Sequence, residues 1–196
     1  MIGKVLSTNP VIKKITFTGS TEVGKLLMKN SSSTVKNISL ELGGNAPFIV
    51  FSDADLDAAL NGFMMAKFRN AGQTCISANR LFVHKSVSNI FTSKLLERLK
   101  KLKVGDGMNG SDIGPLISNE ALKKVINHVS DAKKNGAKIL FGGNKHKLGG
   151  LFFEPTLISN VKKNMKVFQK ENFGPIIPII EFVNDDEVIN MSNETN

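Results

Sequence analysis

The chain has 196 residues and a formal net charge of +9, and hydrophobic residues make up 41% of it against 22% charged residues. This apolar fraction is too high for a disordered chain, and the length suffices for one domain or two small ones. A single cysteine excludes an intramolecular disulfide scaffold and a multi-cysteine zinc site, and no apolar run reaches the ~20 residues that a membrane helix needs.

Lysine supplies most of the positive charge. Of the 26 basic residues only Arg69, Arg80 and Arg98 are arginines, and the lysines are dispersed along the chain. Tyr and Trp are absent, so stacking on nucleic-acid bases would rest on Phe alone. A nucleic-acid-binding surface usually concentrates its basic residues and carries a recognisable motif. We therefore expect a solvated lysine-rich surface, with no nucleic-acid partner and no membrane partner.

Predicted strands and helices alternate along the chain. The spacing predicts strands at 11–17, 37–41, 47–51, 80–84 and 138–141, and a further strand after Gly174-Pro175. It predicts helices over 19–29 after a turn, from Ser52 as the capping residue, from about Val87, and over a run that ends at Asn135-Gly136. The helix after Ser52 has an apolar face formed by Leu56, Leu60, Phe63, Met64 and Phe68. This alternation indicates the α/β class with a largely parallel sheet.

The segment FTGSTEVGK at 17–25 carries the first candidate site. A strand, a Gly-Ser turn and a helix start expose backbone N–H groups at a helix N-terminus, which suits a phosphate. Gly19 to Lys25 also fits the P-loop pattern G-x-x-x-x-G-K, but the next residue is Leu26 and not the Ser or Thr that binds magnesium. A phosphate-binding turn, a P-loop-type phosphate-binding module and an ordinary turn therefore all remain open at this stage.

The only cysteine, Cys75, ends the segment FRNAGQTC at 68–75. A lone cysteine is more often a small buried hydrophobe than a nucleophile. Here its neighbours are polar and it lies just beyond an amphipathic helix, where a loop can present it in a cleft. Because only the thiolate attacks, a nucleophilic role needs electropositive help nearby. The residues alone leave both interpretations open.

Two further segments place an acid beside a glycine turn. In LELGGNAPF at 40–48, Glu41 is either a surface residue at a strand end or a partly desolvated acid suited to general-base work. In KENFGPIIPII at 170–180, Glu171 and Phe173 precede the Gly174-Pro175 turn. The ordinary interpretation of the second segment is a loop with one exposed acid and one packed aromatic ring.

In combination, these four segments resemble the aldehyde dehydrogenase superfamily, with Cys75 standing 34 residues after Glu41. FSDADLDAA at 51–59, IGPLI at 113–117 and FFEPTL at 152–157 match as well, so the resemblance covers essentially the whole chain. Within the superfamily, LELGGNAPFIVF and KFRNAGQTC are most similar to the succinate-semialdehyde dehydrogenase branch. The pattern is specific because order, spacing and residue type agree together.

The resemblance implies NAD- or NADP-dependent oxidation of an aldehyde, with succinate semialdehyde as the substrate and succinate as the product. Cys75 matches the nucleophile, which forms a thiohemiacetal and then, after hydride transfer, a thioester. Glu41 matches the general base that activates the hydrolytic water. Covalent catalysis separates oxidation from hydrolysis. A pyrophosphate at the 17–25 turn needs no magnesium, so the resemblance makes the P-loop module the less favoured alternative.

The same resemblance assigns the binding residues. Gly19 and Ser20 match the turn that contacts the cofactor pyrophosphate. Glu171 matches the residue that holds the nicotinamide ribose, and Phe173 packs beside the nicotinamide. Arg69 matches an arginine that binds the substrate carboxylate, which a planar guanidinium can hold in bidentate fashion; the alternative is a surface charge at a helix end. No metal is implied.

The resemblance also predicts an internal fragment of a longer enzyme. Residues 1–43 would be the C-terminal part of a Rossmann-type dinucleotide-binding domain, and residues 44–196 a truncated catalytic thiol domain. The family's upstream oxyanion-hole asparagine and its NAD-or-NADP selecting residues have no match here, so a catalytically incompetent fragment is the alternative to a working enzyme. The full-length enzyme is expected to be a homo-oligomer, cytoplasmic in a bacterium and mitochondrial in a eukaryote.

Overall fold

A computed structural model describes residues 2–195 of the chain. They form two compact units, one ending at Gly44 and the other beginning at Asn45. Strands alternate with helices in both units, and four of the five strand pairs are parallel, so the predicted α/β class is confirmed.

The first unit holds a parallel pair of strands and two helices, α1 (Ile2–Thr8), β1 (Lys14–Thr18), α2 (Thr21–Ser31) and β2 (Asn37–Glu41), with a 3-10 turn at Ser32–Thr34. The strands pair in register from Lys14 beside Asn37 to Thr18 beside Glu41. The strand predicted at 11–17 therefore begins later than expected. The reason is a turn in which the backbone N–H groups of Val11 and Ile12 donate to Asn9.

A buried lysine connects the turns that precede β1 and β2. The Nζ of Lys36 donates to the carbonyl oxygens of Asn9, at 2.6 Å, and Ile12, at 2.9 Å, and to the hydroxyl of Thr34 at 2.8 Å. A buried ammonium group is costly unless its donors are satisfied, and here all three find an oxygen. Lys36 thus fixes the turn before β1 against the turn before β2.

The second unit is built on one five-stranded sheet, whose strands lie in the order β3-β4-β7-β6-β5. All neighbours are parallel except β5 and β6. Its elements are β3 (Pro47–Val50), α3 (Leu56–Phe68), η2 (Arg69–Gly72), β4 (Arg80–His84), α4 (Lys85–Lys100), η3 (Gly107–Asn109), α5 (Asn119–Lys134), β5 (Lys138–Phe141), β6 (Thr156–Ser159), α6 (Lys166–Gln169), β7 (Ile176–Phe182) and α7 (Asp185–Asn193).

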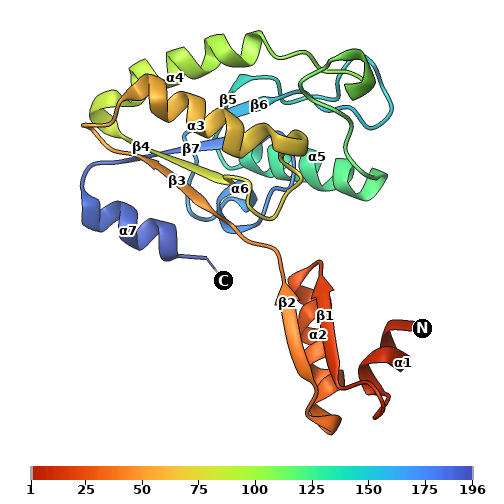
Figure 1. Ribbon diagram of the computed structural model, residues 1–196. Helices are drawn as coiled ribbons and strands as arrows, with labels where there is room; N and C mark the ends of the chain where they lie inside the picture. The colour runs from red at the N-terminus through yellow and green to blue at the C-terminus, as the bar shows by residue number, and fades with distance from the viewer. Residues whose placement is uncertain (1, 196) are drawn as a thin grey trace. The chain divides into compact units, whose positions relative to one another are not determined.

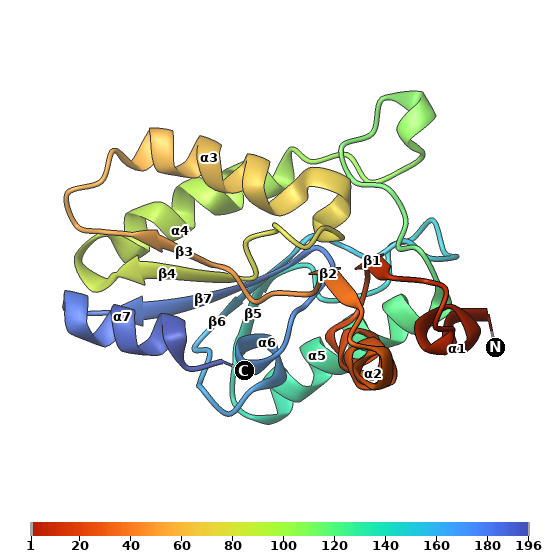
Figure 2. The ribbon, with the colours of Figure 1, turned by 60° about the horizontal axis from the view of Figure 1, so that its bottom comes forward.

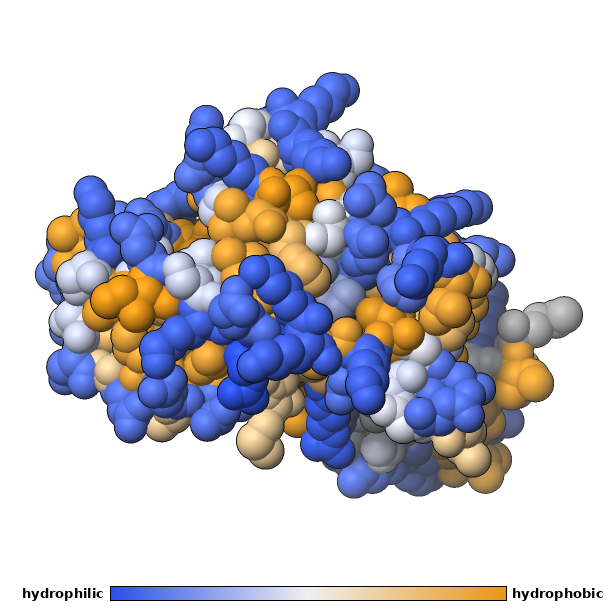
Figure 3. Space-filling model, turned by 90° about the horizontal axis from the view of Figure 1, so that it is seen from above, coloured by the Kyte–Doolittle hydropathy of each residue, from blue (hydrophilic) through white to orange (hydrophobic). Residues whose placement is uncertain are grey.

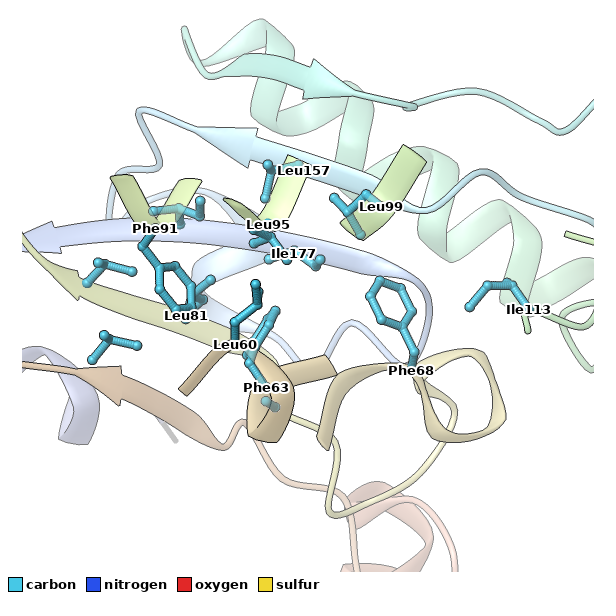
Figure 4. Close-up of a cluster of buried hydrophobic side chains, with 14 of the residues drawn as sticks. Leu60, Phe63, Phe68, Leu81, Phe91, Leu95, Leu99, Ile113, Leu157 and Ile177 are labelled. Atoms are coloured by element: carbon cyan, nitrogen blue, oxygen red, sulfur yellow. The ribbon is translucent and has the colours of Figure 1, made fainter. Parts of the chain in front are cut away.

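Helices cover both faces of this sheet, with α3 and α4 on one side and α5, α6 and α7 on the other (Figures 1 and 2). Side chains alternate along β4, so Leu81 and Val83 join the cluster under α3 and α4 while Phe82 packs with residues of α6 and α7. A strand buried on both faces reads as a continuous apolar run, which explains the RLFVH pattern. Figure 4 shows side chains of α3 and α4 meeting over the central strands.

Two helix starts differ from prediction. Asp55, and not Ser52, caps α3, because its carboxylate accepts from the N–H groups of Asp57 and Ala58, both at 3.0 Å. The helix predicted from about Val87 begins at Lys85, where the ring of His84 accepts from the N–H of Ser86. In both cases the polar side chain that reaches the first free N–H groups sets the boundary.

The sequence pattern predicted no element over β6 or α7. The four residues of β6 follow a proline and are too few for a clear alternation. Helix α7 is capped by Asn184 and begins with three acids, which the helix dipole favours.

Hydrophilic residues are scattered over the face in Figure 3 and are not gathered in one stripe. No helix within residues 2–195 has the length and apolar character that crossing a membrane requires.

Candidate functional site

Two predicted site segments meet at one edge of the parallel pair in the first unit. The N–H of Gly19 donates to the backbone carbonyl of Glu41 at 3.0 Å, directly after the last register pair, Thr18 with Glu41. The side chain of Glu41 is exposed at the end of β2. This edge is the carboxyl end of both strands, where open α/β sheets bind their ligands.

The N-terminus of α2 lies at the same edge. Ser20 caps the helix, and its hydroxyl accepts from the N–H of Val23 at 3.4 Å. The first amides of the helix, those of Thr21 and Glu22, have no acceptor within the helix and point out of its positive end. Backbone donors of this kind suit an anionic phosphate.

Close packing of helix and strand brings these donors to the edge. Gly24 is buried, and a Cβ atom there would lie 2.7 Å from a methyl carbon of Leu42. A Cβ atom here would force the Leu42 side chain to move, so glycine lets α2 lie close to the chain that follows β2, as the last glycine does in dinucleotide-binding turns. Leu26 stands where a P-loop needs a hydroxyl group, and its side chain is exposed.

Cys75 is exposed and lies in the loop that joins α3 to β4, residues 69–79, which we call the cysteine loop. Asn70, Ala71 and Gly72 all have left-handed backbone conformations, with φ of 52°, 56° and 77°. A left-handed residue other than glycine costs roughly 1–2 kcal/mol, so it persists only where its surroundings hold it. The chain thus leaves α3 through a strained turn three residues before Cys75.

Gln73 holds the turn from one side. Its amide nitrogen donates to the carbonyl oxygens of Asn70 and Pro115, each at 3.2 Å, and its amide oxygen accepts from the N–H of Ile117 at 2.8 Å. The side chain is buried, and these bonds tie the cysteine loop to the IGPLI segment. Gln73 was not among the residues predicted from the sequence, and its place two residues before the cysteine was the available signal.

A second predicted segment touches the cysteine loop directly. A Cβ atom on Gly72 would overlap the carbonyl oxygen of Gly174, so the two backbones are in contact. Phe173 has a left-handed backbone with φ of 50°, which is rare for a bulky residue. The loop at 171–174, which we call the ENFG loop, therefore packs against the strained turn. Burial lowers the pKa of Lys124, and the negative charge of Glu171 in this loop partly offsets that effect.

Arg69 lines a groove that also includes the two residues flanking Cys75. The groove has a volume of about 380 Å³, and its wall includes Arg69 together with Thr74 and Ile76, the two neighbours of Cys75. Met65 and Ile76 give it an apolar surface. Arg69 is exposed and no carboxylate within residues 2–195 forms an ion pair with it. The groove therefore offers a guanidinium next to apolar side chains.

Lys67, two residues before Arg69, is a buried residue that was not singled out from the sequence. It lies on the same helix turn as Arg69 but points inward, is fully buried, and its Nζ has no hydrogen-bond partner among residues 2–195. Burial lowers its pKa from 10.5 to about 7. The signal was its spacing, because Leu60, Phe63 and Lys67 share one face of α3.

The structure thus gathers the predicted residues in two groups, each within one unit. Gly19, Ser20 and Glu41 share the carboxyl edge of β1 and β2. Arg69 and Cys75 lie on the cysteine loop and its groove, in contact with the ENFG loop that carries Glu171 and Phe173. No group of three or more His, Cys, Asp or Glu side chains in the described part of the chain could hold a metal ion.

These features define an α/β protein with a strand–turn–helix unit that exposes backbone donors, and with an exposed cysteine on a strained loop whose residues line a groove. The chain belongs to the aldehyde dehydrogenase family, whose model matches residues 1–196. It is 53% identical over 195 residues to a probable NADP(+) succinate-semialdehyde dehydrogenase of Sinorhizobium fredii, and 51% identical to a glutarate-semialdehyde dehydrogenase of Pseudomonas aeruginosa. Each match covers 99% of this chain and 40% of the relative.

A solved structure agrees with this assignment. The crystal structure of an NADP-dependent enzyme of Escherichia coli superposes with a TM-score of 0.97 at 49% identity, over 99% of this chain and 40% of the other. The chain therefore spans about two fifths of the length of the proteins that it matches, and its fold within that span is the family's fold.

Proposed function

We propose that this chain carries the thiol and part of the cofactor site of an NAD- or NADP-dependent semialdehyde dehydrogenase. The substrate would be an aldehyde with a distant carboxylate, and succinate semialdehyde is the first candidate. The observation that carries the proposal is the groove in which Arg69 lies beside both neighbours of the exposed Cys75. A guanidinium pairs with carboxylate in bidentate geometry, and the apolar side chains suit the methylene chain between the two ends.

The names of two relatives support this substrate class. One is named for succinate semialdehyde and the other for glutarate semialdehyde, and both molecules have an aldehyde at one end and a carboxylate at the other. They differ in length by one methylene group, which a hydrophobic pocket distinguishes only by about 1–3 kcal/mol. The shared feature is the carboxylate, so a single arginine beside the thiol is the residue expected to select the class.

In the proposed reaction, the thiolate of Cys75 adds to the aldehyde carbon and gives a thiohemiacetal. The bound dinucleotide supplies the hydride acceptor. Loss of hydride from the thiohemiacetal carbon leaves a thioester on Cys75, and water then attacks the thioester to release the carboxylic acid and the free thiol. Glu41 is the proposed base that takes a proton from this water. Its exposed place at the end of β2 leaves the carboxylate accessible to solvent.

The proposed cofactor residues fit an anionic dinucleotide. The turn at Gly19 and Ser20 places the first amides of α2 at the carboxyl edge of the strands, and Gly24 permits the close packing that brings them there. Glu171 would accept from the nicotinamide ribose and Phe173 would pack beside the ring. On this proposal residues 1–43 belong to the dinucleotide-binding domain and residues 44–196 to the catalytic domain. Nothing observed favours the P-loop alternative, which Leu26 opposes.

The test uses a chimera of family length, in which these residues replace the matching segment of the Sinorhizobium fredii relative. The chimera should reduce NADP⁺ or NAD⁺ with succinate semialdehyde, and Cys75→Ser should abolish that activity. Arg69→Ala should lower kcat/KM for succinate semialdehyde by an amount equal to the loss of about 2–5 kcal/mol of transition-state stabilisation, as for a desolvated charge pair. It should change kcat/KM for butanal far less.

Arg98→Ala is the matched control, since the Arg98 guanidinium bonds to Asn61 on the surface, away from the groove. It should leave both substrates unaffected. Equal losses with succinate semialdehyde and butanal in the Arg69→Ala chimera would remove the carboxylate assignment. A chimera that oxidises aldehydes with Cys75→Ser in place would contradict the proposed nucleophile.

A further inference from the structure

A buried polar network joins helix α5 to both loops of the candidate site. Its members are His128 in α5, Asn172 in the ENFG loop and Asn79 at the end of the cysteine loop, and their exposed fractions are 4%, 0% and 1%. The Nδ1 of His128 lies 2.9 Å from the amide oxygen of Asn172. None of the three was assigned a role from the sequence, and the reaction proposed above does not use them.

The side-chain amide and the backbone N–H of Asn172 are all hydrogen-bonded. Its backbone N–H donates to the side-chain oxygen of Asn79 at 3.0 Å, and its amide nitrogen donates to the backbone carbonyls of Asn79, at 3.3 Å, and Val167, at 3.2 Å. Asn79 in turn donates to the carbonyl of Ser77 at 3.4 Å, two residues beyond Cys75. The pair Asn79–Asn172 therefore links the cysteine loop to the ENFG loop through buried bonds.

These bonds determine the protonation of His128. Both hydrogens of the Asn172 amide face carbonyl groups, so its oxygen faces His128 and can only accept. Nδ1 of His128 must therefore carry the hydrogen. Burial lowers the pKa of His128 below its ordinary value, so the ring is neutral at pH 7 and Nε2 carries no hydrogen. A neutral His128 donates one hydrogen bond that fixes the orientation of the Asn172 amide.

The residue after Asn172 needs this support. Phe173 holds a left-handed backbone, and such strain persists only where neighbours over-determine it. On its other side, a Cβ atom on Gly174 would lie 2.6 Å from a methyl of Val125, so α5 limits that residue as well. The ENFG loop is thus held by α5 at two points, through His128 to Asn172 and through Val125 to Gly174.

We propose that His128 is a positioning residue, which acts through Asn172 and Asn79 to fix the ENFG loop against the cysteine loop. It would set where Glu171 and Phe173 stand relative to Cys75, and thereby the affinity for the nicotinamide half of the dinucleotide. The effect on dinucleotide affinity rests on the proposed function, whereas the first step, the positioning of the ENFG loop, concerns this chain alone. The two steps can therefore be tested separately.

The first experiment measures hydrogen exchange of the 196-residue chain over the segment 171–174. His128→Ala should speed exchange there by about tenfold or more, without a matching change in the central strands. His128→Asn should restore protection, because its amide nitrogen can donate from the position of Nδ1. Val129→Ala is the control, since Val129 is buried on the same helix but contacts the apolar cluster. Equal changes in His128→Ala and Val129→Ala would overturn the positioning role.

Two further readouts separate positioning from general stability. Nitrogen-15 spectra should show hydrogen on Nδ1 of His128, and hydrogen on Nε2 instead would overturn the proposal. In the chimera, His128→Ala should raise KM for the dinucleotide by about tenfold, with KM for the aldehyde changed less than about twofold. Equal increases in both values would overturn the link to the cofactor. A chimera that shows no dinucleotide-dependent activity with His128 intact would refute the proposed function and leave the exchange result standing.

Discussion

Replacing Lys67 by methionine tests the energetic cost of its buried amine in α3. Methionine has nearly the same length, and Lys67 already lies on the apolar face of α3 with Leu60 and Phe63. The side chain is 0% exposed, and its Nζ has no partner among residues 2–195. The substitution therefore removes an unpaired polar atom from the interior and leaves no cavity of appreciable size.

The magnitude follows from the pKa of Lys67, which burial lowers from 10.5 to about 7. One pKa unit corresponds to about 1.4 kcal/mol, so at pH 7 the preference of the unfolded chain for the Lys67 proton lowers the free energy of unfolding by about 4 kcal/mol. This penalty is fully present below about pH 7. It shrinks by about 1.4 kcal/mol per pH unit as the pH rises from about 7 to 10.5, because the unfolded chain binds one proton more than the folded chain over that range, and it vanishes above the unfolded value of 10.5. The wild-type chain should therefore gain stability relative to Lys67→Met as the pH increases.

Urea unfolding followed by circular dichroism, between about pH 6 and about pH 10, measures the difference. Lys67→Met should be more stable by about 2–4 kcal/mol at neutral pH, and the gap should close towards pH 10. Lys133→Met, at an exposed position in α5, should show no pH-dependent gap. A gap that stays constant with pH, or a variant less stable than wild type throughout, would refute the argument that Lys67 is an unpaired buried amine.

Three further predictions concern the second unit. Gly72→Ala should lower the free energy of unfolding by roughly 3 kcal/mol, because the new Cβ meets the Gly174 carbonyl. Gly110→Ala is the control: the backbone there is also left-handed but the space is open, so the loss should be about 1 kcal/mol. Equal shifts of the two variants in thermal unfolding would contradict the contact. Arg80→Met should destabilise the chain by about 2 kcal/mol or more, since the buried guanidinium satisfies three backbone carbonyls, and urea titration checks this. Cys75 should react completely with a maleimide in the native chain, because its side chain is exposed, and mass spectrometry that finds unlabelled native protein would count against that exposure.

The local structure around the candidate residues could be predicted because its signals are local in sequence. The Gly-Ser turn between β1 and α2 follows from neighbouring residues, as does the polar stretch that presents Cys75 outside the core. The antiparallel strand pair β5–β6 was harder, because four residues after a proline give no periodicity to detect. The cap of α3 was misplaced by three residues because Ser52 and Asp55 are both good capping residues, and only the backbone turn at 51–54 decides between them.

Other features depend on which distant segments meet. Gly72 and Gly174 are about a hundred residues apart, and neither sequence context reveals that their backbones touch. The spacing of His128 places it on the buried face of α5, but its partners are not known until Asn172 and Asn79 are brought beside that face. Lys67 reads as the polar end of α3, although the helical phase alone already placed it on the face of Leu60 and Phe63.

The α/β class, the order of most strands and helices, and the family could all be read from the residues, because each rests on periodicity, capping or motif spacing within short windows. That Gln73, the ENFG loop and the Asn79–Asn172 pair hold the cysteine loop became visible only in the folded chain. The reason is physical: a side chain's partner, burial and protonation are properties of the packed neighbourhood, and that neighbourhood is assembled from segments far apart in the chain.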